Sequence, residues 1–308
     1  MVTDSILSIT DDFFRLGSQP FPIFLYCAGN GDAVLLEGSV TVSGVMCIEQ
    51  LQSLGIEPSA VSRLLITHSH GDHVFGAVPL RDTYPELEIM GSARAQEKMA
   101  DLKLMSMFRD VDDQSTELLK QAGIVESRHV YARDESPLVS VDTVIAEGDR
   151  VELGPDDFFE VHFAPGHSDC SLSFYHPSKK LLVISDAAGT PLTACNRWWN
   201  LYFDGYAQVL ETVDRLSRFD ADVLCPGHMS VIQGRDAVQA FWDDARQALA
   251  KCHQHIIDSF RTGRTRREIA EAMGLGVYEG YPYTPLKFIQ KTCSMLTRRS
   301  LEYEEIEY

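Results

Sequence analysis

In the stretch LLITHSHGDHVFG, Leu64–Gly76, three histidines and an aspartate occupy six positions directly after an aliphatic run. The run VSRLLIT, residues 61–67, is typical of a buried strand. Ionisable side chains therefore stand where a core strand ends. In an extended chain His68 and His70 project to the same side, so both can bind one ion.

The second half of this cluster turns away from the strand. Gly71 allows a turn, and Asp72 and His73 follow it, where they can face a neighbouring site. Imidazole and carboxylate are ligands that divalent zinc, iron and manganese accept. We therefore predict a metal site at the end of this strand.

Three isolated residues of the same kind follow other apolar runs. His167 ends FFEVHFAPGH, Asp186 lies in KLLVISDAAG, and His228 ends ADVLCPGH. Open α/β folds collect functional residues where core strands finish. These three residues are therefore expected to complete the ligand set.

The composition of the chain indicates which kinds of molecule the protein can bind and in which cell compartment it is expected. The 308 residues carry 27 basic and 45 acidic side chains, a formal charge of −18, which repels nucleic acid and anionic membranes. The start MVTDSILSITDDFF has no basic leader, and no apolar run reaches the ~18 residues of a membrane span. Seven scattered cysteines without CxxC spacing indicate reduced thiols rather than disulfides or a zinc knuckle. We predict a cytoplasmic protein that binds neither nucleic acid nor a membrane.

The remaining pattern indicates two groups of strands and several helices. Strands are expected at 13–17, 22–29, 33–40 and 61–67, and then at 141–154, 158–167, 170–177, 180–189 and 221–228. Helices are expected at 45–54, 92–126, 206–218, 235–260, 265–274 and 284–301.

The motif H-x-H-x-D-H with later single His, Asp and His residues resembles the metallo-β-lactamase superfamily, over roughly Phe13 to Gly234. The resemblance implies an α/β fold, a four-layer αββα sandwich of two sheets with helices outside. The segment at about 92–126 is interpreted as a helical insertion. The chain then divides into a metallo-β-lactamase-fold domain, 1–234, and a C-terminal helical cap, 235–308.

The resemblance also implies a dinuclear site of two divalent ions, with zinc expected and iron or manganese as alternatives. The implied ligands are His68, His70 and His167 for the first ion, Asp72, His73 and His228 for the second, and Asp186 as the bridge. The other histidines, His129, His162, His176, His253 and His255, match no motif position and are interpreted as structural or surface residues.

Two such ions lower the pKa of water from about 15.7 to about 7 and so supply a bridging hydroxide as nucleophile. Asp72 is the candidate catalytic acid or base. We predict a hydrolase of a small-molecule thioester or ester. The alternatives are an acyl-homoserine-lactone-type lactonase, a mono-iron dioxygenase of the same fold, and a slow enzyme that acts mainly as a regulatory binding module. A β-lactam substrate is disfavoured because the chain has no export signal.

Within the superfamily, the chain resembles the glyoxalase II-like branch that contains the quinolone-signal-response thioesterase, which acts on 2-aminobenzoylacetyl-CoA. The likeness rests on SDAAGTPLTACNRWWNLYFDGYAQVLETVDRLSRF and the helical C-terminal segment. Two features depart from simpler relatives. Glu37-Gly38 stands where many have an Asp-x-Gly turn. In addition, His167 lies 94 positions after His73 (167 − 73), a longer interval than in simpler relatives.

The loop after Asp186 is aromatic and is a candidate wall of an acyl pocket. Its candidate residues are Trp198, Trp199, Tyr202 and Phe203, which alternatively pack the C-terminal helices onto the sandwich. In the insertion, Met105, Met107 and Phe108 are candidates for the other wall, for core packing or for a homodimer face. The basic group Arg261, Arg264, Arg266 and Arg267 suits either an anionic substrate group such as a CoA phosphate or a solvated helix end.

Overall fold

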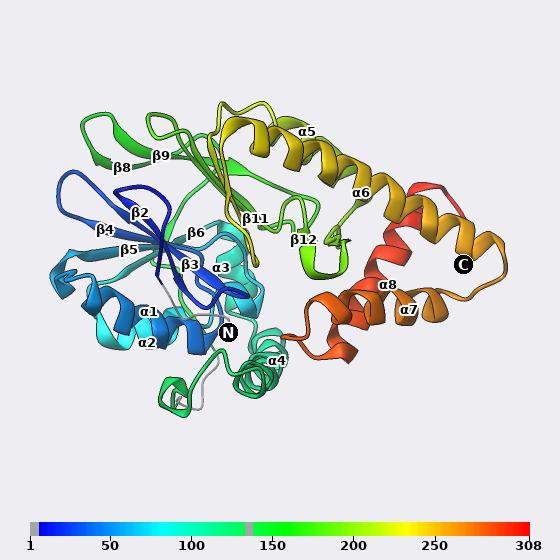
Figure 1. The fold of residues 1–308 in the computed structure, drawn as a ribbon, viewed down its shortest axis with the longest axis horizontal. Helices are drawn as coiled ribbons and strands as arrows, with labels where there is room; N and C mark the ends of the chain where they lie inside the picture. The colour runs from blue at the N-terminus through cyan, green and yellow to red at the C-terminus, as the bar shows by residue number, and fades with distance from the viewer. Residues whose placement is uncertain (1–5, 133–137) are drawn as a thin grey trace.

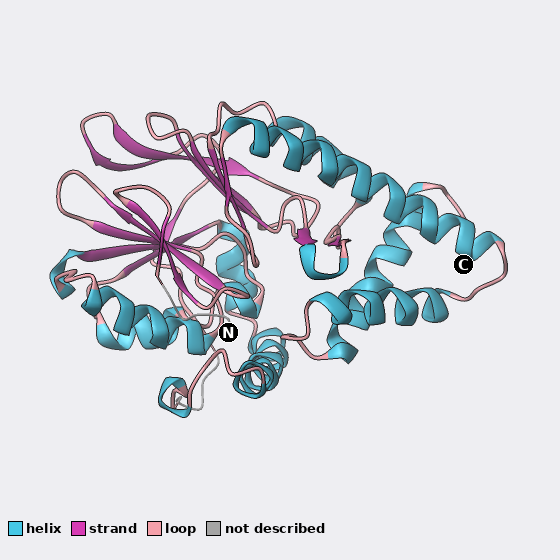
Figure 2. Cartoon of the chain, in the orientation of Figure 1, coloured by secondary structure: helices cyan, strands magenta, loops and turns pink. Residues whose placement is uncertain are grey.

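The computed structural model describes residues 6–132 and 138–308. It shows two β-sheets packed face to face, with α1 and α2 outside one sheet and α5 and α6 outside the other (Figure 1). The same layering is visible by element type in Figure 2. This arrangement confirms the predicted αββα sandwich with a helical insertion and a helical C-terminal extension. The start of the predicted first domain, and with it the first residues of MVTDSILSITDDFF, lies outside the described residues.

The first sheet has the order β1-β2-β3-β4-β5-β6-β7. Its strands are β1 (Leu7–Ser8), β2 (Phe13–Gly17), β3 (Pro22–Cys27), β4 (Ala33–Leu36), β5 (Val61–Leu65), β6 (Glu88–Gly91) and β7 (Thr143–Val144). Strands β1 to β4 pair antiparallel, as short hairpin connections allow, whereas β4 to β7 pair parallel. The predicted antiparallel opening of the sheet is confirmed.

The second sheet has the order β15-β14-β11-β10-β9-β8 and is antiparallel except for the β11–β14 pair. Its strands are β8 (Arg150–Gly154), β9 (Asp157–Phe163), β10 (Leu172–His176), β11 (Leu181–Ser185), β14 (Val223–Pro226) and β15 (Ile232–Gln233). A separate hairpin joins β12 (Thr190–Leu192) to β13 (Arg197–Trp199).

Helices fill the connections and the C-terminal segment. The α-helices are α1 (Thr41–Ser53), α2 (Ala77–Thr83), α3 (Ala93–Met99), α4 (Leu102–Gln121), α5 (Tyr206–Leu216), α6 (Arg235–Arg261), α7 (Arg266–Gly280) and α8 (Leu286–Tyr303). The 3₁₀ turns are η1 (Pro58–Ala60), η2 (Gly71–His73), η3 (Ser127–His129) and η4 (Thr193–Cys195).

One predicted strand was wrong as a single element. The segment 141–154 forms β7 in the first sheet and β8 in the second, so the chain crosses between the sheets here. The crossing is made at Gly148, whose φ of 86° allows the reversal. Apolar residues on both sides of the turn, at 141–146 and at 151–153, made the segment look like one strand.

Three apolar clusters hold the layers together. One lies between the two sheets and includes Phe13, Phe24, Phe159 and Phe174, each at most 1% exposed. A second joins the first sheet to α1, α2, α3 and α4, and a third joins the second sheet to α5 and the C-terminal helices. Burial of this extent is the main favourable term in folding. It fixes the strand ends from which the site is built.

None of the helices in the described residues is long and apolar enough to cross a membrane. All seven cysteines lie in described residues and are free thiols.

Candidate metal centre

The loop after β5 carries the first histidine cluster. His70 is extended, with φ −68° and ψ 146°, and precedes the short turn η2 that contains Asp72 and His73. His68 is buried and His70 is half-buried. The turn is possible because Gly71 packs against Phe108 of α4, where a Cβ would lie 2.7 Å from the Phe108 Cβ. The helical insertion therefore holds this loop in place.

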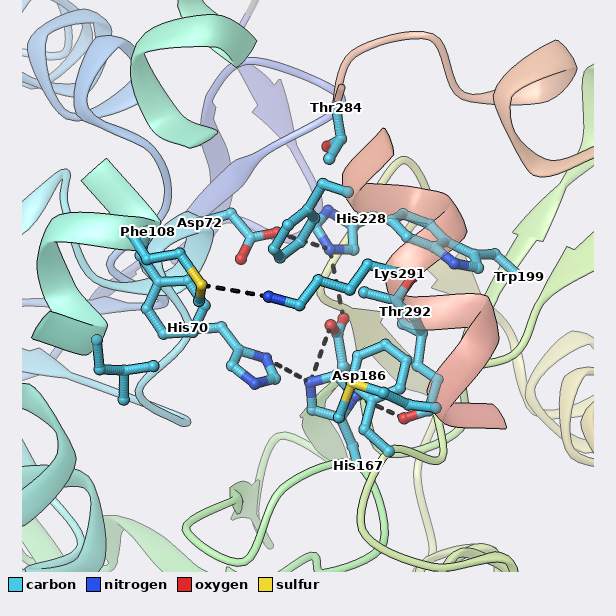
Figure 3. A pocket seen from close by; sticks show the side chains of 16 residues that line it. His70, Asp72, Phe108, His167, Asp186, Trp199, His228, Thr284, Lys291 and Thr292 are labelled. Carbon is cyan, nitrogen blue, oxygen red and sulfur yellow. Dashed lines mark hydrogen bonds and ion pairs between the residues drawn. The ribbon is translucent and has the colours of Figure 1, made fainter. Parts of the chain in front are cut away.

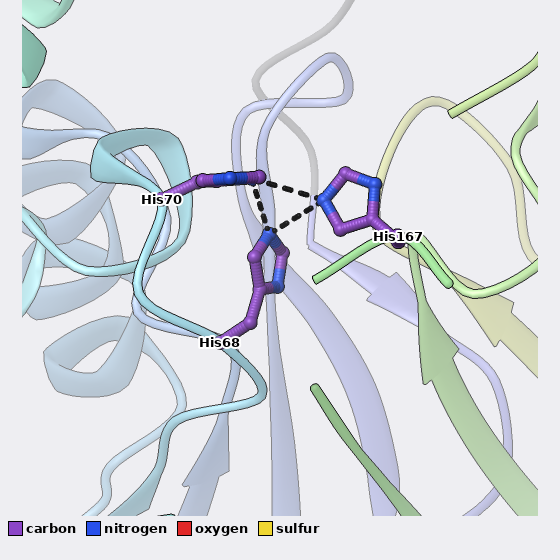
Figure 4. Close-up of side chains that lie close together, drawn as sticks. All are labelled: His68, His70 and His167. Carbon is purple, nitrogen blue, oxygen red and sulfur yellow. Dashed lines mark hydrogen bonds between the residues drawn. The ribbon is translucent and has the colours of Figure 1, made fainter. Parts of the chain in front are cut away.

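Three imidazoles converge on one point (Figure 4). His167 follows β9, and its Nε2 lies 3.1 Å from His68 Nε2 and 2.9 Å from His70 Nδ1. His68 Nε2 and His70 Nδ1 are themselves 3.0 Å apart. Nitrogens on a tetrahedral zinc ion with bonds of 2.0–2.1 Å stand about 3.3 Å apart. The spacing therefore fits three ligands of one divalent ion after only a small expansion.

A second group of ligand atoms lies beside the first. Asp72, His73 and His228 bring one ligand atom each within 4.8 Å of one another. Asp72 Oδ2 is 3.8 Å from His73 Nε2 and 3.7 Å from His228 Nε2. His228 reaches this point from the end of β14 (Val223–Pro226).

Asp186 lies between the two groups. Its Oδ2 is 3.4 Å from His167 Nε2 and 3.4 Å from His73 Nε2, and its Oδ1 is 3.5 Å from His228 Nε2. It follows β11, where Ser185 adopts φ 50° and turns the chain toward the site. Gly227 makes room for this carboxylate, because a Cβ there would lie 2.5 Å from Asp186 Oδ1.

Hydrogen bonds on the far nitrogens orient these rings. Nδ1 of His167 donates to the Leu201 carbonyl at 2.7 Å, and Nδ1 of His228 donates to the Pro20 carbonyl at 2.9 Å. Nδ1 of His73 donates to Glu37 Oε2 at 2.7 Å. In each case the proton on Nδ1 leaves the Nε2 lone pair facing the centre, the form that binds a metal.

The electrostatics of the site suit a cation. Burial lowers the pKa of His68 and His70 well below its ordinary value, and the neighbouring imidazoles lower it further. Burial would raise the pKa of Asp186, but His228 and His73 hold it well below its usual range. Neutral imidazoles at His68 and His70 beside an ionised carboxylate at Asp186 are the protonation states that metal ligands have.

Two buried atoms of the site also lack a hydrogen-bond partner. His73 Nε2 and Asp186 Oδ1 are unpaired within the described part of the chain. Leaving such groups unpaired in the interior is costly. A cation bound between them would satisfy both, so the donor set fits the binding of divalent metal.

A cavity of about 290 Å³ opens onto these residues (Figure 3). Trp199 and Phe203 line it, as expected for the aromatic loop, and so do Met107 and Phe108 of α4. Leu104 also faces it, one turn before Phe108 on the same side of the helix.

The structure places three candidate pocket residues elsewhere. Tyr202 is fully buried, and its hydroxyl bonds Ser300 Oγ at 2.9 Å on α8, so it packs the C-terminal helices onto the sandwich. Met105 is fully buried in the core and does not line this cavity. Trp198 donates to the Ala188 carbonyl at 3.0 Å and lines a second cavity instead.

Sequence reasoning predicted a C-terminal helical cap but did not name the residues of α8 and of the segment before it that line the first cavity. The helix and this segment add Thr284, Phe288, Lys291, Thr292 and Met295 to the lining of the first cavity, as Leu201 does from the aromatic loop. The lining residues of α8 are three to four positions apart and so share one face of the helix. The sequence alone does not show that this face meets the metal site. Lys291 is the only cationic lysine or arginine among the described residues that line this cavity.

The basic group near the start of α7 lies outside the first cavity. Arg267 pairs with Glu271 at 2.7 Å, Arg266 lies over the Tyr308 ring at 4.2 Å, and Arg264 lines the second cavity. The histidines without motif positions make other contacts, such as His176 with Asp157 at 2.8 Å and His253 with Glu304 at 3.1 Å.

The sequence and the fold were compared with known proteins. The model of the metallo-beta-lactamase superfamily matches residues 22–228. A hydroxyacylglutathione hydrolase of Cereibacter sphaeroides is 26% identical over 170 residues, which cover 54% of this chain and 48% of that protein. One from Crocosphaera subtropica is 25% identical over 203 residues, covering 65% of this chain and 60% of the other. The chain therefore spans only about half of the length of these curated relatives.

Solved structures share the fold. A metallo-beta-lactamase family protein from Thermus thermophilus superposes with a TM-score of 0.65 at 16% identity, covering 97% of this chain and 95% of that one. The stereoselective inverting sec-alkylsulfatase of a Pseudomonas species gives a TM-score of 0.61 at 17% identity, covering 87% of this chain and 45% of the other.

Proposed function

The chain belongs to the metallo-beta-lactamase superfamily, and on that premise we propose that it is a dinuclear metal-dependent hydrolase of thioesters or esters. The observation that carries the proposal is the position of Asp186. Its two carboxylate oxygens reach His167 and His73 at 3.4 Å and His228 at 3.5 Å, and so contact both histidine groups. A carboxylate shared between two ligand groups suits a pair of ions rather than one.

In this proposal His68, His70 and His167 hold one divalent ion, Asp72, His73 and His228 hold the other, and Asp186 serves both. When bound, such ions supply a water-derived nucleophile at neutral pH and stabilise negative charge on a carbonyl oxygen. The protein contributes the fixed tautomers and the buried setting. Glu37, Leu201 and Pro20 accept the Nδ1 protons and hold three rings in place.

Asp72 is the proposed proton-transfer residue. Its side chain is 29% exposed whereas that of Asp186 is 4% exposed, and it faces the cavity. A carboxylate at the cavity wall can accept a proton during attack and return it to the leaving group.

The cavity favours an acyl group with an apolar or aromatic body. Its wall is formed by the aromatic side chains Phe108, Trp199, Phe203 and Phe288 with Leu104, Leu201 and Met295. Nζ of Lys291 lies at the cavity, 3.4 Å from Met107 Sδ, and places a positive charge near an otherwise apolar wall (Figure 3). The names of the curated relatives favour a thioester over a simple ester.

The test is a hydrolysis panel on protein whose metal content has been measured. Acyl thioesters, aryl esters and lactones are compared on one metal-replete sample. We expect two equivalents of metal and turnover of thioesters. We expect His70→Ala to lose metal and to lower kcat/KM by more than about 100-fold, because removing even an outer hydrogen-bond partner of a ligand costs 10–100-fold.

The matched control is His162→Ala, which removes a histidine that contacts Glu147 away from the site. It should keep both metal and activity. Full activity of His70→Ala would contradict the proposal. One equivalent of iron with oxygen consumption and no hydrolysis would favour the dioxygenase alternative, and faster lactone than thioester turnover would favour the lactonase.

A further inference from the structure

A second cavity lies among the helices of the C-terminal segment. It is bordered by the β12–β13 hairpin, α6, α7 and α8. Its volume is about 760 Å³, against about 290 Å³ for the first cavity. Volumes of this size are typical of small-molecule sites.

The lining of this second cavity combines an apolar floor with a basic rim. The floor contains Val277, Cys293 and Leu296, all buried. The rim contains Arg197, Lys251 and Arg264 with His255, against the single carboxylate Asp244. The cations therefore outnumber the carboxylates at this cavity, whereas the whole chain has 45 acidic and 27 basic residues.

Two of these cations are available to a ligand. Arg197 has Glu279 at 3.7 Å. For Lys251 and Arg264, no carboxylate of the described residues lies within ion-pair distance, and both side chains are exposed at the rim. An ammonium and a guanidinium beside an apolar floor are the groups that recognise a carboxylate or phosphate on a hydrophobic body.

The wall between the two cavities is Trp199. This residue lines both cavities, and its ring stacks on the His228 imidazole with centroids 5.8 Å apart and planes at 27°. Its Nε1 and the neighbouring Asn200 Oδ1 are buried without a hydrogen-bond partner in the described ranges. Both belong to residues that line the second cavity.

We propose that the second cavity binds a small amphiphilic anion, an apolar or aromatic body that carries one carboxylate or phosphate. Lys251 and Arg264 bind the anionic group, and the buried floor holds the body. Because Trp199 contacts both this cavity and His228, a ligand there alters the environment of the proposed metal centre. This site is separate from the one that holds the hydrolase substrate.

The experiment uses the full chain and the indole N–H signals of its three tryptophans, labelled with ¹⁵N. Octanoate and octyl phosphate are the two anionic probes, and 1-octanol is the neutral probe. The Trp199 signal, assigned with Trp199→Phe, should shift with either anion in a saturable way. The stronger of the two anions identifies the preferred head group.

Two blocking variants separate the cavities. Ala272→Phe fills the second cavity from an exposed position on α7, and Leu104→Trp fills the first from α4. We expect Ala272→Phe to abolish the shift and Leu104→Trp to keep it. The matched control Ala240→Phe, an exposed alanine on α6 outside both cavities, should titrate as the wild type does.

Charge removal provides the second measurement. The double variant Lys251→Gln/Arg264→Gln should weaken the binding of the anions about 100-fold, which is about tenfold for each of the two charge-assisted hydrogen bonds lost, and leave the binding of 1-octanol unchanged. A shift that persists in Ala272→Phe, a shift lost only in Leu104→Trp, or no saturable shift at millimolar probe would overturn the proposal. None of these readouts depends on hydrolysis, so failure of this proposal can be distinguished from failure of the proposed function.

Discussion

Glu37 occupies a backbone position that few side chains accept. Its φ is 73°, in the left-handed region that favours glycine, and its side chain is 1% exposed. Holding a non-glycine residue there costs about 1 kcal/mol or more. The compensation is the contact with His73, whose Nδ1 donates to Glu37 Oε2 at 2.7 Å. Burial would lower the pKa of His73, but Glu37 and Asp186 hold it well above its ordinary value.

Replacing Glu37 by glutamine tests this orienting role. In Glu37→Gln the side-chain size is kept, but the charge that fixes the His73 tautomer is removed. We expect metal affinity at the Asp72–His73–His228 group to fall 10–100-fold, as for other partners of metal-bound histidines. Competition with a chelating dye measures the change.

Two variants control this experiment. Glu49→Gln removes a glutamate near His129, outside the metal centre, and should leave affinity unchanged. Glu37→Asp keeps the charge and should recover part of the affinity. Unchanged affinity in Glu37→Gln would show that the contact only packs the turn.

The ligand residues could be predicted from the sequence because the metal chemistry restricts them to a few residue types. His68, His70, Asp72 and His73 follow one strand at fixed spacing, and a strand end leaves little freedom in where they point. The role of Glu37 appeared only as a departure from the usual turn. The position of Met105 depended on the rotation of α4 about its axis, which is set by packing against the core.

At the level of elements, a polar contact joins the two sheets opposite the metal centre. Asp157 of β9 accepts hydrogen bonds from Tyr26 of β3 and His176 of β10, each at 2.8 Å, and from the Gly29 N–H at 3.1 Å. Burial would raise the pKa of Asp157, but these donors hold it below its usual value of 3.8. Burial also lowers the pKa of His176, which keeps the ring neutral.

Asp157→Asn is expected to lower the free energy of unfolding by about 1–2 kcal/mol at pH 7, because the amide oxygen cannot accept from all three donors. A carboxyl group whose pKa is lower in the folded state than in the unfolded state stabilises the folded state at any pH above its unfolded pKa. That stabilisation is lost as the pH falls through the pKa of the folded state. The difference between wild type and variant should therefore shrink as pH falls below 3.8. Urea unfolding at neutral and acid pH measures it.

The neighbouring residue provides the control for this prediction. Asp156 is exposed, and Asp156→Asn tolerates the same left-handed backbone, φ 58°. It should change stability by less than about 0.5 kcal/mol. An Asp157→Asn variant with the same deficit at every pH would show that shape, rather than charge, makes the contact.

Long elements were predicted better than short ones, for a physical reason. Helices expected at 235–260 and 284–301 form as α6 and α8 within two residues, because many periodic positions specify them. The insertion at 92–126 forms two helices rather than one. Asp101 begins α4 and accepts from the N–H groups of Lys103 and Leu104. In contrast, α2 and β6 were not predicted, since a short element carries little periodic signal and depends on its neighbours.

Across the whole molecule, the metal centre joins parts of the chain that fold in different sheets. His68, His70, Asp72 and His73 follow β5 of the first sheet, whereas His167, Asp186 and His228 follow β9, β11 and β14 of the second. Sequence spacing shows that such residues exist but not that the two sheet edges meet. The edges meet because the apolar faces of both sheets pack against each other over residues such as Phe24 and Phe174.

Ions held between these edges would bind the folded state and not the unfolded one. Each occupied site then stabilises the protein by RT ln(1 + [metal]/Kd), about 2.7 kcal/mol when free metal is 100 times Kd. We expect chelation to lower Tm by at least several degrees, since 1 kcal/mol corresponds to about 2–4 °C in a chain of 150–250 residues. Calorimetry of the metal-replete and chelated protein measures the shift.

Two variants show whether this response comes from the metal centre. His167→Ala removes a ligand from the second sheet and should lose most of the Tm shift on chelation, and His162→Ala should retain it. A Tm that chelation does not change would mean that the two edges are held together by apolar packing alone and that the His and Asp cluster does not bind metal tightly in the folded protein. An equal shift in His167→Ala would mean that the stabilising metal does not depend on this ligand from the second sheet.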